Sequence, residues 1–288
     1  MKTAIRTDLS NEDYHSLLAI GSSGLKLLQR SPAHYWAQYV NPDRSRKEPT
    51  PAMKLGTAVH CAILEQGEFD NRYVTVPEGI DKRTKDGKAL FAEIEASGKE
   101  PLTPDNRQLI LSMASAALAL PVSIHLFGLE HYTEHSLFWT DPETGADCKI
   151  RPDFHVPPCP QFPNGIIMDV KTCQDASPIE FSRNAWNSDM HLQAALYCDG
   201  FKHVYKTDGY PMFLWLAVEK ESPFACKYYS AQADLLAYGL KELRPLLALF
   251  AECVRTGQWP AYDWNITPLE LPTWAAKTVA EALAANEN

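Results

Sequence analysis

Apolar and polar residues alternate along the chain in blocks that predict both helices and strands. Helical spacing and helix-start signals predict helices over residues 11–40 (two short helices in tandem), 53–65, 88–97, 105–120, 190–197 and 230–256. Shorter apolar runs bounded by turn residues predict strands at 74–76, 133–140, 148–155, 165–172 and 210–218. Helices and strands are mixed along one chain, so we expect an α/β architecture with extra helices at the N-terminus.

The clearest sheet signal lies between residues 133 and 172. Asp141-Pro142-Glu143-Thr144-Gly145 predicts a hairpin turn between the strands at 133–140 and 148–155. We expect these two strands and the one at 165–172 to belong to one sheet. The chain shows no internal repeat, low-complexity tract or interdomain linker. We therefore expect a single domain over residues 1–288, with a core from about 8 to 260 and a C-terminal tail from 261.

Composition narrows the class of protein. The chain has 288 residues, of which 45% are hydrophobic and 22% are charged, as in ordinary folded domains. No apolar run approaches the ~20 residues that a membrane span needs, and the first residues are polar, so we expect a cytoplasmic protein without a membrane partner. The seven cysteines are odd in number and include no C-x2-C pair, so we interpret them as buried thiols.

Charge argues against indiscriminate nucleic-acid binding but leaves room for a local basic groove. The net charge is −9. Positive charge nevertheless gathers in two loops. One holds Arg44, Arg46 and Lys47, and the other, residues 81–88, carries four cations. Either loop is a solvated surface segment or a set of phosphate contacts.

Two aspartates and a lysine stand out among the predicted strands. In the strand at 165–172, side chains alternate between faces, so Asp169 and Lys171 point the same way while Met168 and Val170 face the opposite layer. Asp153 follows Pro152 at a strand end, where an extended backbone gives way to a loop. The two carboxylates can therefore converge.

A cluster of buried carboxylates needs a cation to neutralise it. Mg²⁺ prefers oxygen ligands and keeps several waters, so two carboxylates, a backbone carbonyl and phosphate oxygens would suit it. Lys171 would then orient an attacking water and stabilise developing charge. The alternative is an ordinary surface pair of Asp169 and Lys171 on a half-exposed strand.

Several motifs in order resemble the PD-(D/E)xK nuclease superfamily, and within it the RecE-type exonucleases, with lambda exonuclease and RecB-like nucleases as more distant relatives. The motifs are Gly56-Thr57-Ala58-Val59-His60 with Leu64-Glu65, Arg151-Pro152-Asp153, Asp169-Val170-Lys171-Thr172, and Gln193-Ala194-Ala195-Leu196-Tyr197. Residues 31–35 and 81–85 add to the likeness, which spans residues 8 to 260. Each motif is short, and their order and spacing are more specific than any one alone. The resemblance implies a central mixed β-sheet flanked by helices.

The resemblance also implies roles at the metal site. It implies that Asp153 bridges two Mg²⁺ ions, that Asp169 and the Val170 backbone carbonyl complete one metal shell, and that His60 ligates the second ion. Imidazole is a softer ligand than carboxylate, so Mn²⁺ is a candidate substitute. The alternative for His60 is a core histidine on a buried helix.

Further residues receive roles around the metal site. By resemblance, Lys171 positions the hydrolytic water, while Gln193 and Tyr197, at i and i+4 on one helix face, hold the scissile strand or the lysine. Their alternative is simple helix packing. Ser22 and Ser23, at a predicted helix start, are candidates for a terminal phosphate, with helix capping as the alternative for Ser23.

Candidates for the DNA channel are Arg83, Lys85 and Arg183. An enzyme that threads DNA past its catalytic groups needs cations only along its channel, so a net acidic exterior fits. Trp186 could stack on a base or wedge the strands apart, with core packing as its alternative.

The resemblance implies a Mg²⁺-dependent 5′-to-3′ double-strand DNA exonuclease that releases 5′-mononucleotides and leaves a 3′ single-stranded tail. It also implies a RecT-type annealing protein as partner and a homo-oligomeric ring, tetrameric in RecE-type enzymes. One alternative is a RecB/Cas4-like single-strand DNA nuclease, although the cysteine spacing supplies no iron–sulfur site. The other is a non-catalytic DNA-end-binding or assembly module that keeps the fold.

Overall fold

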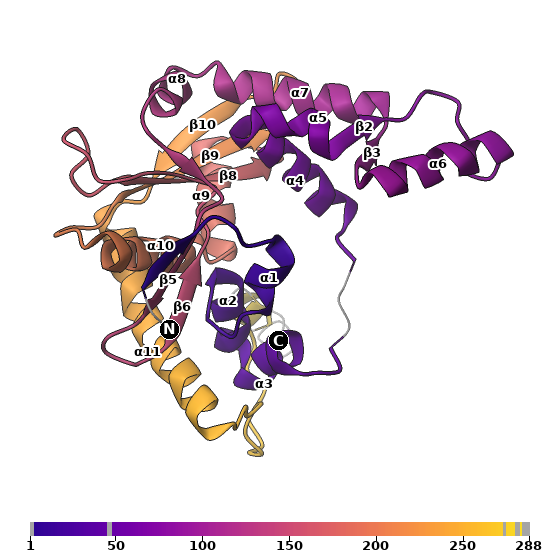
Figure 1. Cartoon of the computed structure of the whole chain (residues 1–288). Coiled ribbons are helices and arrows are strands. Elements are labelled where there is room, and N and C mark those ends of the chain that lie inside the picture. Colours follow the sequence, from indigo (N-terminus) through magenta and orange to yellow (C-terminus); the bar gives the residue numbers. More distant parts are fainter. Residues whose placement is uncertain (1–2, 45–47, 273–274, 280–282, 284–288) are drawn as a thin grey trace.

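The computed structural model describes residues 3–44, 48–272, 275–279 and 283. A mixed five-stranded sheet forms its centre (Figure 1). In spatial order its strands are β10 (Cys226–Ser230), β9 (Met212–Glu219), β8 (Ile166–Cys173), β7 (Phe154–Val156) and β4 (Tyr132–Thr133). Strands β8 and β9 are parallel, and the other neighbours are antiparallel. The expected α/β class with a central mixed sheet is confirmed.

Two smaller sheets accompany the central one. β1 (Ala4–Arg6), β5 (Ser136–Thr140) and β6 (Asp147–Ile150) form an antiparallel sheet, and β2 (Tyr73–Thr75) pairs in parallel with β3 (Glu100–Leu102). The predicted hairpin turn joins β5 to β6. Asp141 Oδ1 accepts hydrogen bonds from the N–H groups of Glu143 and Thr144, and Gly145 has a φ of +74°, which glycine adopts without strain.

The expectation that 133–140, 148–155 and 165–172 lie in one sheet is wrong. Each of the first two segments breaks into two strands. The first passes from the central sheet (β4) to the small one (β5), and the second passes from the small sheet (β6) to the central one (β7). Glu134, with a φ of 54°, lies in the interval between β4 and β5, and Pro152, which has no N–H for a ladder bond, lies in the interval between β6 and β7. The two breaks face each other, since Glu134 N–H donates to the carbonyl of Asp153 at 3.3 Å.

Helices cover both faces of the central sheet (Figure 1). On one face lie α4 (Pro51–Leu64) and α7 (Pro104–Leu118), which bury Met168, Val170 and Leu216 of the strands. On the other lie α2 (Ser22–Arg30), α10 (Met190–Tyr205) and α11 (Ala233–Thr256), which bury Ile167 and Phe213. The remaining helical elements are α1 (Asn11–Ser16), α3 (Pro32–Tyr35), a π-helical turn (Trp36–Val40), a 3₁₀ turn (Gln66–Glu68), α5 (Phe69–Arg72), α6 (Lys85–Ser97), α8 (Pro121–Phe127) and α9 (Pro178–Asn187).

Most predicted helices are present with shifted ends, and several elements were not predicted. Residues 11–40 form more than the two expected helices, and α10 runs on to Tyr205, well past the predicted 190–197. The short elements α8, α9 and β10 were missed. Both α8 and α9 begin at a proline, which fits the first helical turn as readily as it ends a helix.

The chain after α11 returns to the N-terminal helices. Trp259 stacks on Tyr35 with ring centroids 5.3 Å apart, and Ala33 N–H donates to the carbonyl of Pro260. These contacts tie residue 260 to the N-terminal helices, while the single domain with a core from about 8 to 260 stays a prediction.

Composition predicts that the cysteines are buried thiols and that the chain has no membrane span. The cysteines are free thiols, five buried and two, Cys159 and Cys226, partly exposed, so the expectation of burial holds for five of them. Among the described residues, no single helix is long and apolar enough to cross a membrane. The bent pair α7–α8 meets that length and composition only when its two helices are taken together.

Candidate functional site

Strand β8 places two opposite charges on one face of the central sheet. Lys171 Nζ lies 2.5 Å from Asp169 Oδ2, and the side chains are 30% and 4% exposed. Met168 and Val170 alternate with them and pack into the core on the other face. The predicted alternation is confirmed, and because the aspartate is buried, the alternative of an ordinary surface pair is wrong.

Helix α10 bonds to both strands that carry the aspartates. Gln193 Nε2 donates to Asp169 Oδ1 at 2.6 Å, and the Tyr197 hydroxyl, one turn later, donates to the Arg151 carbonyl at 3.3 Å. The glutamine is buried, and burial raises the pKa of Tyr197 well above its usual value. Helix packing alone therefore does not describe these two side chains.

Asp153 meets β8 at the break between β6 and β7. Its Oδ2 accepts a hydrogen bond of 2.7 Å from the Val170 N–H. The N–H and C=O of one residue point to the same edge of a strand, so the Val170 carbonyl also points to the edge where Asp153 lies. The structure thus brings together Asp153, Asp169 and Lys171, as the sequence motifs predict.

His60 and Glu134 complete the cluster. On α4, His60 Nδ1 lies 3.4 Å from Asp153 Oδ2, and its side chain is 27% exposed, so the core-histidine alternative is wrong. The ligating atoms of His60, Glu134 and Asp153 all lie within 4.8 Å of one another. Sequence analysis missed Glu134. The available signal was a carboxylate inside the predicted strand at 133–140, just before its apolar residues 137–139.

Burial disfavours ionisation of two carboxylates of this cluster, Glu134 and Asp153. Burial and, next, the charge of Asp153 raise the pKa of Glu134 to about 8. Burial also raises the pKa of Asp153, which the imidazole of His60 partly offsets. Burial by itself lowers the pKa of Lys171, but Asp169 and Asp153 outweigh it, so the net pKa is raised and Lys171 stays an ammonium.

The donor set fits a divalent cation. The carboxylates of Glu134 and Asp153 converge with the His60 imidazole, and Asp169 lies close enough for its charge to act on Asp153. Oxygen ligands of this kind suit Mg²⁺ or Mn²⁺. The buried Asp169 Oδ2 accepts no hydrogen bond of good geometry, although Lys171 lies beside it. A buried oxygen with an unused lone pair is what a cation would complete.

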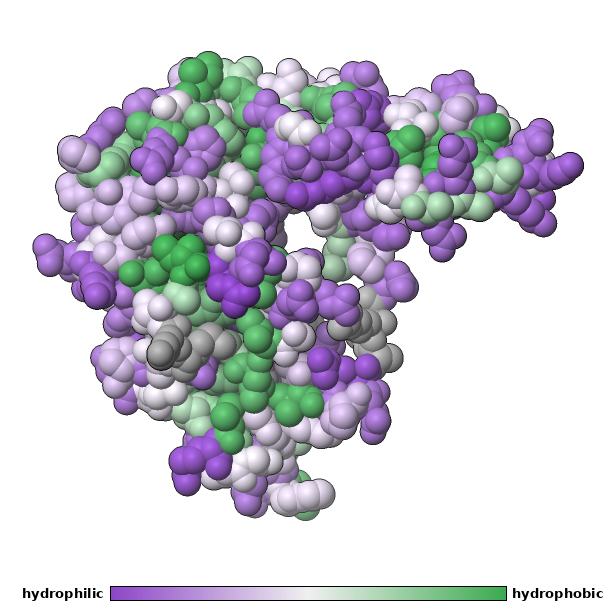
Figure 2. All heavy atoms as spheres, in the orientation of Figure 1, coloured by the Kyte–Doolittle hydropathy of each residue, from purple (hydrophilic) through white to green (hydrophobic). Residues whose placement is uncertain are grey.

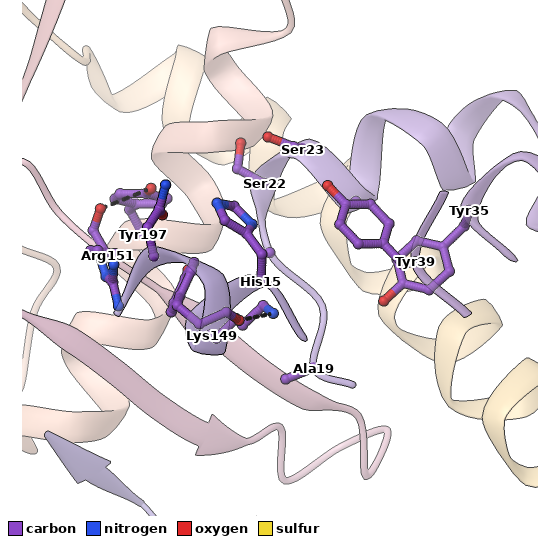
Figure 3. Close-up of a pocket in the computed structure, with 13 residues that line it drawn as sticks. His15, Ala19, Ser22, Ser23, Tyr35, Tyr39, Lys149, Arg151 and Tyr197 are labelled. Atoms are coloured by element: carbon purple, nitrogen blue, oxygen red, sulfur yellow. Dashed lines mark hydrogen bonds between the residues drawn. The ribbon is translucent and has the colours of Figure 1, made fainter. Parts of the chain in front are cut away.

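A pocket of about 200 Å³ adjoins the cluster (Figure 3). Tyr197 and Arg151 line it at one end, Tyr35 and Tyr39 lie at the other, and Ser22 and Ser23 of α2 lie between them. The first intrahelical bond of α2 runs from Leu25 N–H to the Gly21 carbonyl, so the N–H groups of both serines lack an intrahelical acceptor. Gly21 is the N-cap residue and no side chain caps the helix, so the capping alternative for Ser23 is wrong.

The two cations of this pocket already bind the N-terminal segment. Lys149 Nζ donates to the carbonyls of Tyr14 and Leu17 at 2.6 and 2.8 Å, and burial lowers its pKa to about 8. Arg151 donates to Ser136 Oγ and to the Leu9 carbonyl. They position α1 beside the pocket, and their charge also favours an anion there.

Lys26 is a further cation that sequence analysis missed. It lies on α2, one turn after Ser22, and its Nζ donates to the Ser188 carbonyl. Burial lowers the pKa of Lys26, and the charges of Asp189, Lys171 and Asp169 act on it, so it lies near the pair of Asp169 and Lys171. Helical spacing from Ser22 was the signal that could have found it.

The other predicted DNA contacts lie outside this cluster. Arg83 and Lys85 are on the arm that ends in α6 and projects from the body (Figure 1), and Arg83 pairs with Asp81 at 2.7 Å. Arg183 lies on α9 and pairs with Glu180 at 2.6 Å. Arg44 donates to the carbonyl of Asn41 in its own loop. Arg46 and Lys47 lie outside the described residues.

Comparisons with known proteins agree with this geometry. Residues 21–266 match the family described as "PDDEXK-like domain of unknown function". Among solved structures, a "putative exonuclease" from Eubacterium rectale matches with a TM-score of 0.56 and 14% identity, over 96% of this chain and 99% of that one. The protein SSO0001 matches with a TM-score of 0.29 and 13% identity over 68% and 86%, too weakly to support any conclusion. No curated protein sequence matches the chain.

Proposed function

The chain belongs to the family of PDDEXK-like domains of unknown function, and from that premise we propose that it is a divalent-metal-dependent nuclease. The observation that carries the proposal is the convergence of Asp153, Asp169 and Lys171 beside the edge of β8. His60 and Glu134 lie around the same point. This set can hold a cation next to a phosphodiester and places the Lys171 ammonium, paired with Asp169, beside the phosphate.

In this proposal Asp153, Asp169 and the Val170 carbonyl hold one Mg²⁺ ion, and His60 and Glu134 with Asp153 hold a second, with Mn²⁺ able to substitute. A bound divalent cation supplies charge stabilisation at the phosphate and acidifies a water molecule. Glu134 adds a hard oxygen ligand where the sequence motifs offered only an imidazole.

The remaining residues orient the reacting groups. Lys171 donates hydrogen bonds to the attacking water or to the phosphate oxygens, and the neighbouring carboxylates keep it protonated. Gln193 fixes the carboxylate plane of Asp169, and Tyr197 fixes the strand end before Asp153 through the Arg151 carbonyl. Both therefore act as positioning residues.

The finer proposal is a 5′-to-3′ double-strand DNA exonuclease that releases 5′-mononucleotides. The pocket beside Tyr197 supports it, because the N–H groups of Ser22 and Ser23 can bind a terminal phosphate there. A 3′ tail would remain for a RecT-type annealing protein, and subunits would form a ring, tetrameric by resemblance. A cytoplasmic location belongs to the same proposal.

Digestion of end-labelled linear duplex DNA tests both the general nuclease proposal and the finer exonuclease proposal. With Mg²⁺ or Mn²⁺ the protein should shorten the duplex, EDTA should stop it, and Asp169→Asn should lower the rate at least about 100-fold, because the cation loses a charged ligand. Asp208→Asn, at an exposed loop position before β9, is the matched control and should digest like the wild type.

The label position and the 5′ end distinguish the alternatives. Release of 5′-labelled mononucleotides from the duplex supports the finer proposal, and a 5′-phosphate should speed digestion unless Ser22 and Ser23 are both replaced by alanine. Cleavage of single strands only would favour the RecB/Cas4-like alternative. Intact duplex and intact single strands at every metal concentration would leave the non-catalytic DNA-end-binding module.

A further inference from the structure

An aromatic cavity of about 440 Å³ lies next to the catalytic strand, among α9, the start of α10, strands β9 and β10, and the start of α11 (Figure 1). Its lining includes Phe181, Trp186, His191, Trp215 and Tyr229. None of these residues takes part in the metal cluster or in the pocket beside Ser22. The cavity is therefore a second candidate binding site.

Strand register places this cavity beside the scissile position. Asp169 of β8 pairs with Trp215 of β9, which pairs in turn with Tyr229 of β10. Directly paired residues point to the same face, and neighbouring strands are about 4.8 Å apart, so Tyr229 lies about 10 Å from Asp169 across the sheet. That separation is on the scale of one or two nucleotides of an extended strand.

The cavity offers flat aromatic surface to solvent. Trp186 is 58% exposed, so the alternative that it packs into the core is wrong. Its ring stacks on His191 at 5.1 Å and lies 5.6 Å from Tyr238, which holds the indole in place while leaving much of it uncovered. An exposed, oriented indole is well suited to stacking on a nucleobase.

Two of the side chains that line the cavity each carry a buried polar atom without a partner. Trp215 Nε1 is a donor with no acceptor, although its residue is only 2% exposed. His191 Nε2 lies 2.8 Å from Glu242 Oε2, and because a carboxylate only accepts, Nε2 carries the proton. His191 Nδ1 then remains an acceptor without a donor in the neutral ring. Both atoms are buried, so they are not within reach of a base edge, and the contact available to a base is stacking on Trp186.

Positive charge at the rim matches a phosphate. Arg183 lies one turn before Trp186 on α9, so the guanidinium and the indole share a helix face. Arg183 is 63% exposed and its partner, Glu180, is also exposed, so a phosphate can compete for it. An exposed stacking surface and a nearby cation together suit the base and the phosphate of one nucleotide.

We propose that this cavity binds an unpaired nucleobase of the nucleic-acid substrate, stacked on Trp186 with a neighbouring phosphate against Arg183. The inference rests on the proposed nuclease function and names the part of the substrate that lies beyond the scissile bond. Because stacking is tolerant of sequence, the cavity fixes the strand without selecting a base.

Binding without hydrolysis tests the proposal. A fluorescein-labelled, single-stranded thymidine 12-mer is titrated with the full-length protein in EDTA and followed by anisotropy. Trp186→Ala should weaken binding about 10-fold, because stacking one base contributes on that order, while Trp186→Phe should recover most of the affinity. Trp264→Ala, at a fully exposed tryptophan outside the cavity, is the matched control.

Abasic oligonucleotides decide between a base and a backbone contact. Removing one base at a time should weaken binding by the wild type at one position, and Trp186→Ala should abolish that dependence. Equal affinity of the wild type for every abasic 12-mer, or unchanged binding by folded Trp186→Ala, would overturn the proposal. Because hydrolysis is measured separately with Mg²⁺ or Mn²⁺, an active enzyme with no Trp186 effect leaves the nuclease proposal standing.

Discussion

At the residue scale, the candidate site depends on two interruptions in strands. Pro152 ends the pairing of one strand and Glu134 adopts a left-handed conformation in the other. The breaks place the Asp153 and Glu134 carboxylates together, facing His60. A continuous strand at either position would have kept alternating its side chains between the two faces. The local irregularity is therefore what assembles the ligands.

Glu134→Gln should weaken metal binding while keeping the fold. The amide replaces a charged oxygen ligand, so we expect the Kd for Mn²⁺, measured by isothermal titration calorimetry, to rise about 10-fold. Metal-free stability should match or exceed that of the wild type, since burial disfavours the carboxylate. Glu130→Gln, at an exposed position of the loop before β4, is the control. An unchanged Kd with a lowered melting temperature would assign Glu134 a structural role instead.

Lys149 predicts a pH dependence of stability. Its pKa falls from 10.5 to about 8 on folding, because burial disfavours the ammonium. The free-energy cost of burying the ammonium is complete below pH 8, where Lys149 is charged in both the folded and the unfolded state. This cost disappears as the pH rises to 10.5. The wild type should therefore gain up to about 3 kcal/mol relative to Lys149→Met across this window. Urea unfolding at pH 7, 9 and 10 measures the difference.

The matched control for Lys149 is Lys88→Met, at an exposed position of α6. Its stability difference from the wild type should stay level over the same pH range. If the difference for Lys149→Met is equally level, the ammonium is not buried at the Tyr14 and Leu17 carbonyls.

At the element scale, α10 organises the site from the opposite side of the sheet to α4. Gln193 holds Asp169, and Tyr197 holds the strand end before Asp153. The position of α10 depends in turn on α11, because Gly239 allows close approach to the His191 backbone. The packing of α11 against α10 therefore affects the position of Asp169 on β8, because α10 is hydrogen-bonded to that aspartate.

Gly239→Ala should destabilise the protein. A Cβ there would lie 2.4 Å from the His191 carbonyl oxygen, so α10 and α11 must separate. We expect the free energy of unfolding to fall by about 2 kcal/mol, measured by urea denaturation. Gly67→Ala, where no atom lies within 4 Å of the added Cβ, should leave it nearly unchanged. Equal midpoints for both variants would contradict the close packing of the two helices.

At the scale of the whole molecule, the surface has a hollow and a projecting arm. Figure 2 shows a hollow between the N-terminal helices and the region of α4, and an arm whose tip is covered by hydrophilic residues. The arm consists of β2, α6 and β3, and it carries Arg83 and Lys85. The arm projects away from the central sheet, so it is a candidate for holding duplex DNA beyond the site. The prediction that Arg83 and Lys85 contact DNA therefore stays a prediction.

Replacing both Arg83 and Lys85 with alanine should reduce the salt dependence of duplex binding. If each cation contacts one phosphate, the slope of log K against log salt should fall by about 2 units, measured by anisotropy in EDTA. Lys241→Ala, at an exposed position of α11, should leave the slope unchanged. An unaltered slope in the double variant would remove the arm from the DNA path.

The sequence by itself determined the class of fold, most of the longer elements and the core of the site. Asp169 and Lys171 could be predicted to share a face because strand alternation is a local rule, and His60, Asp153, Gln193 and Tyr197 followed from the order of short motifs. A hairpin turn and a helix start are likewise set by nearby residues.

Tertiary structure alone decided which strands share a sheet and which distant side chains meet. Glu134 became a candidate ligand because its strand breaks opposite Asp153, and Lys26 lies near Asp169 only because α2 packs on that face. The aromatic cavity required register across three strands. Such contacts join residues far apart in the chain, and their free energy comes from packing and burial that no local pattern encodes.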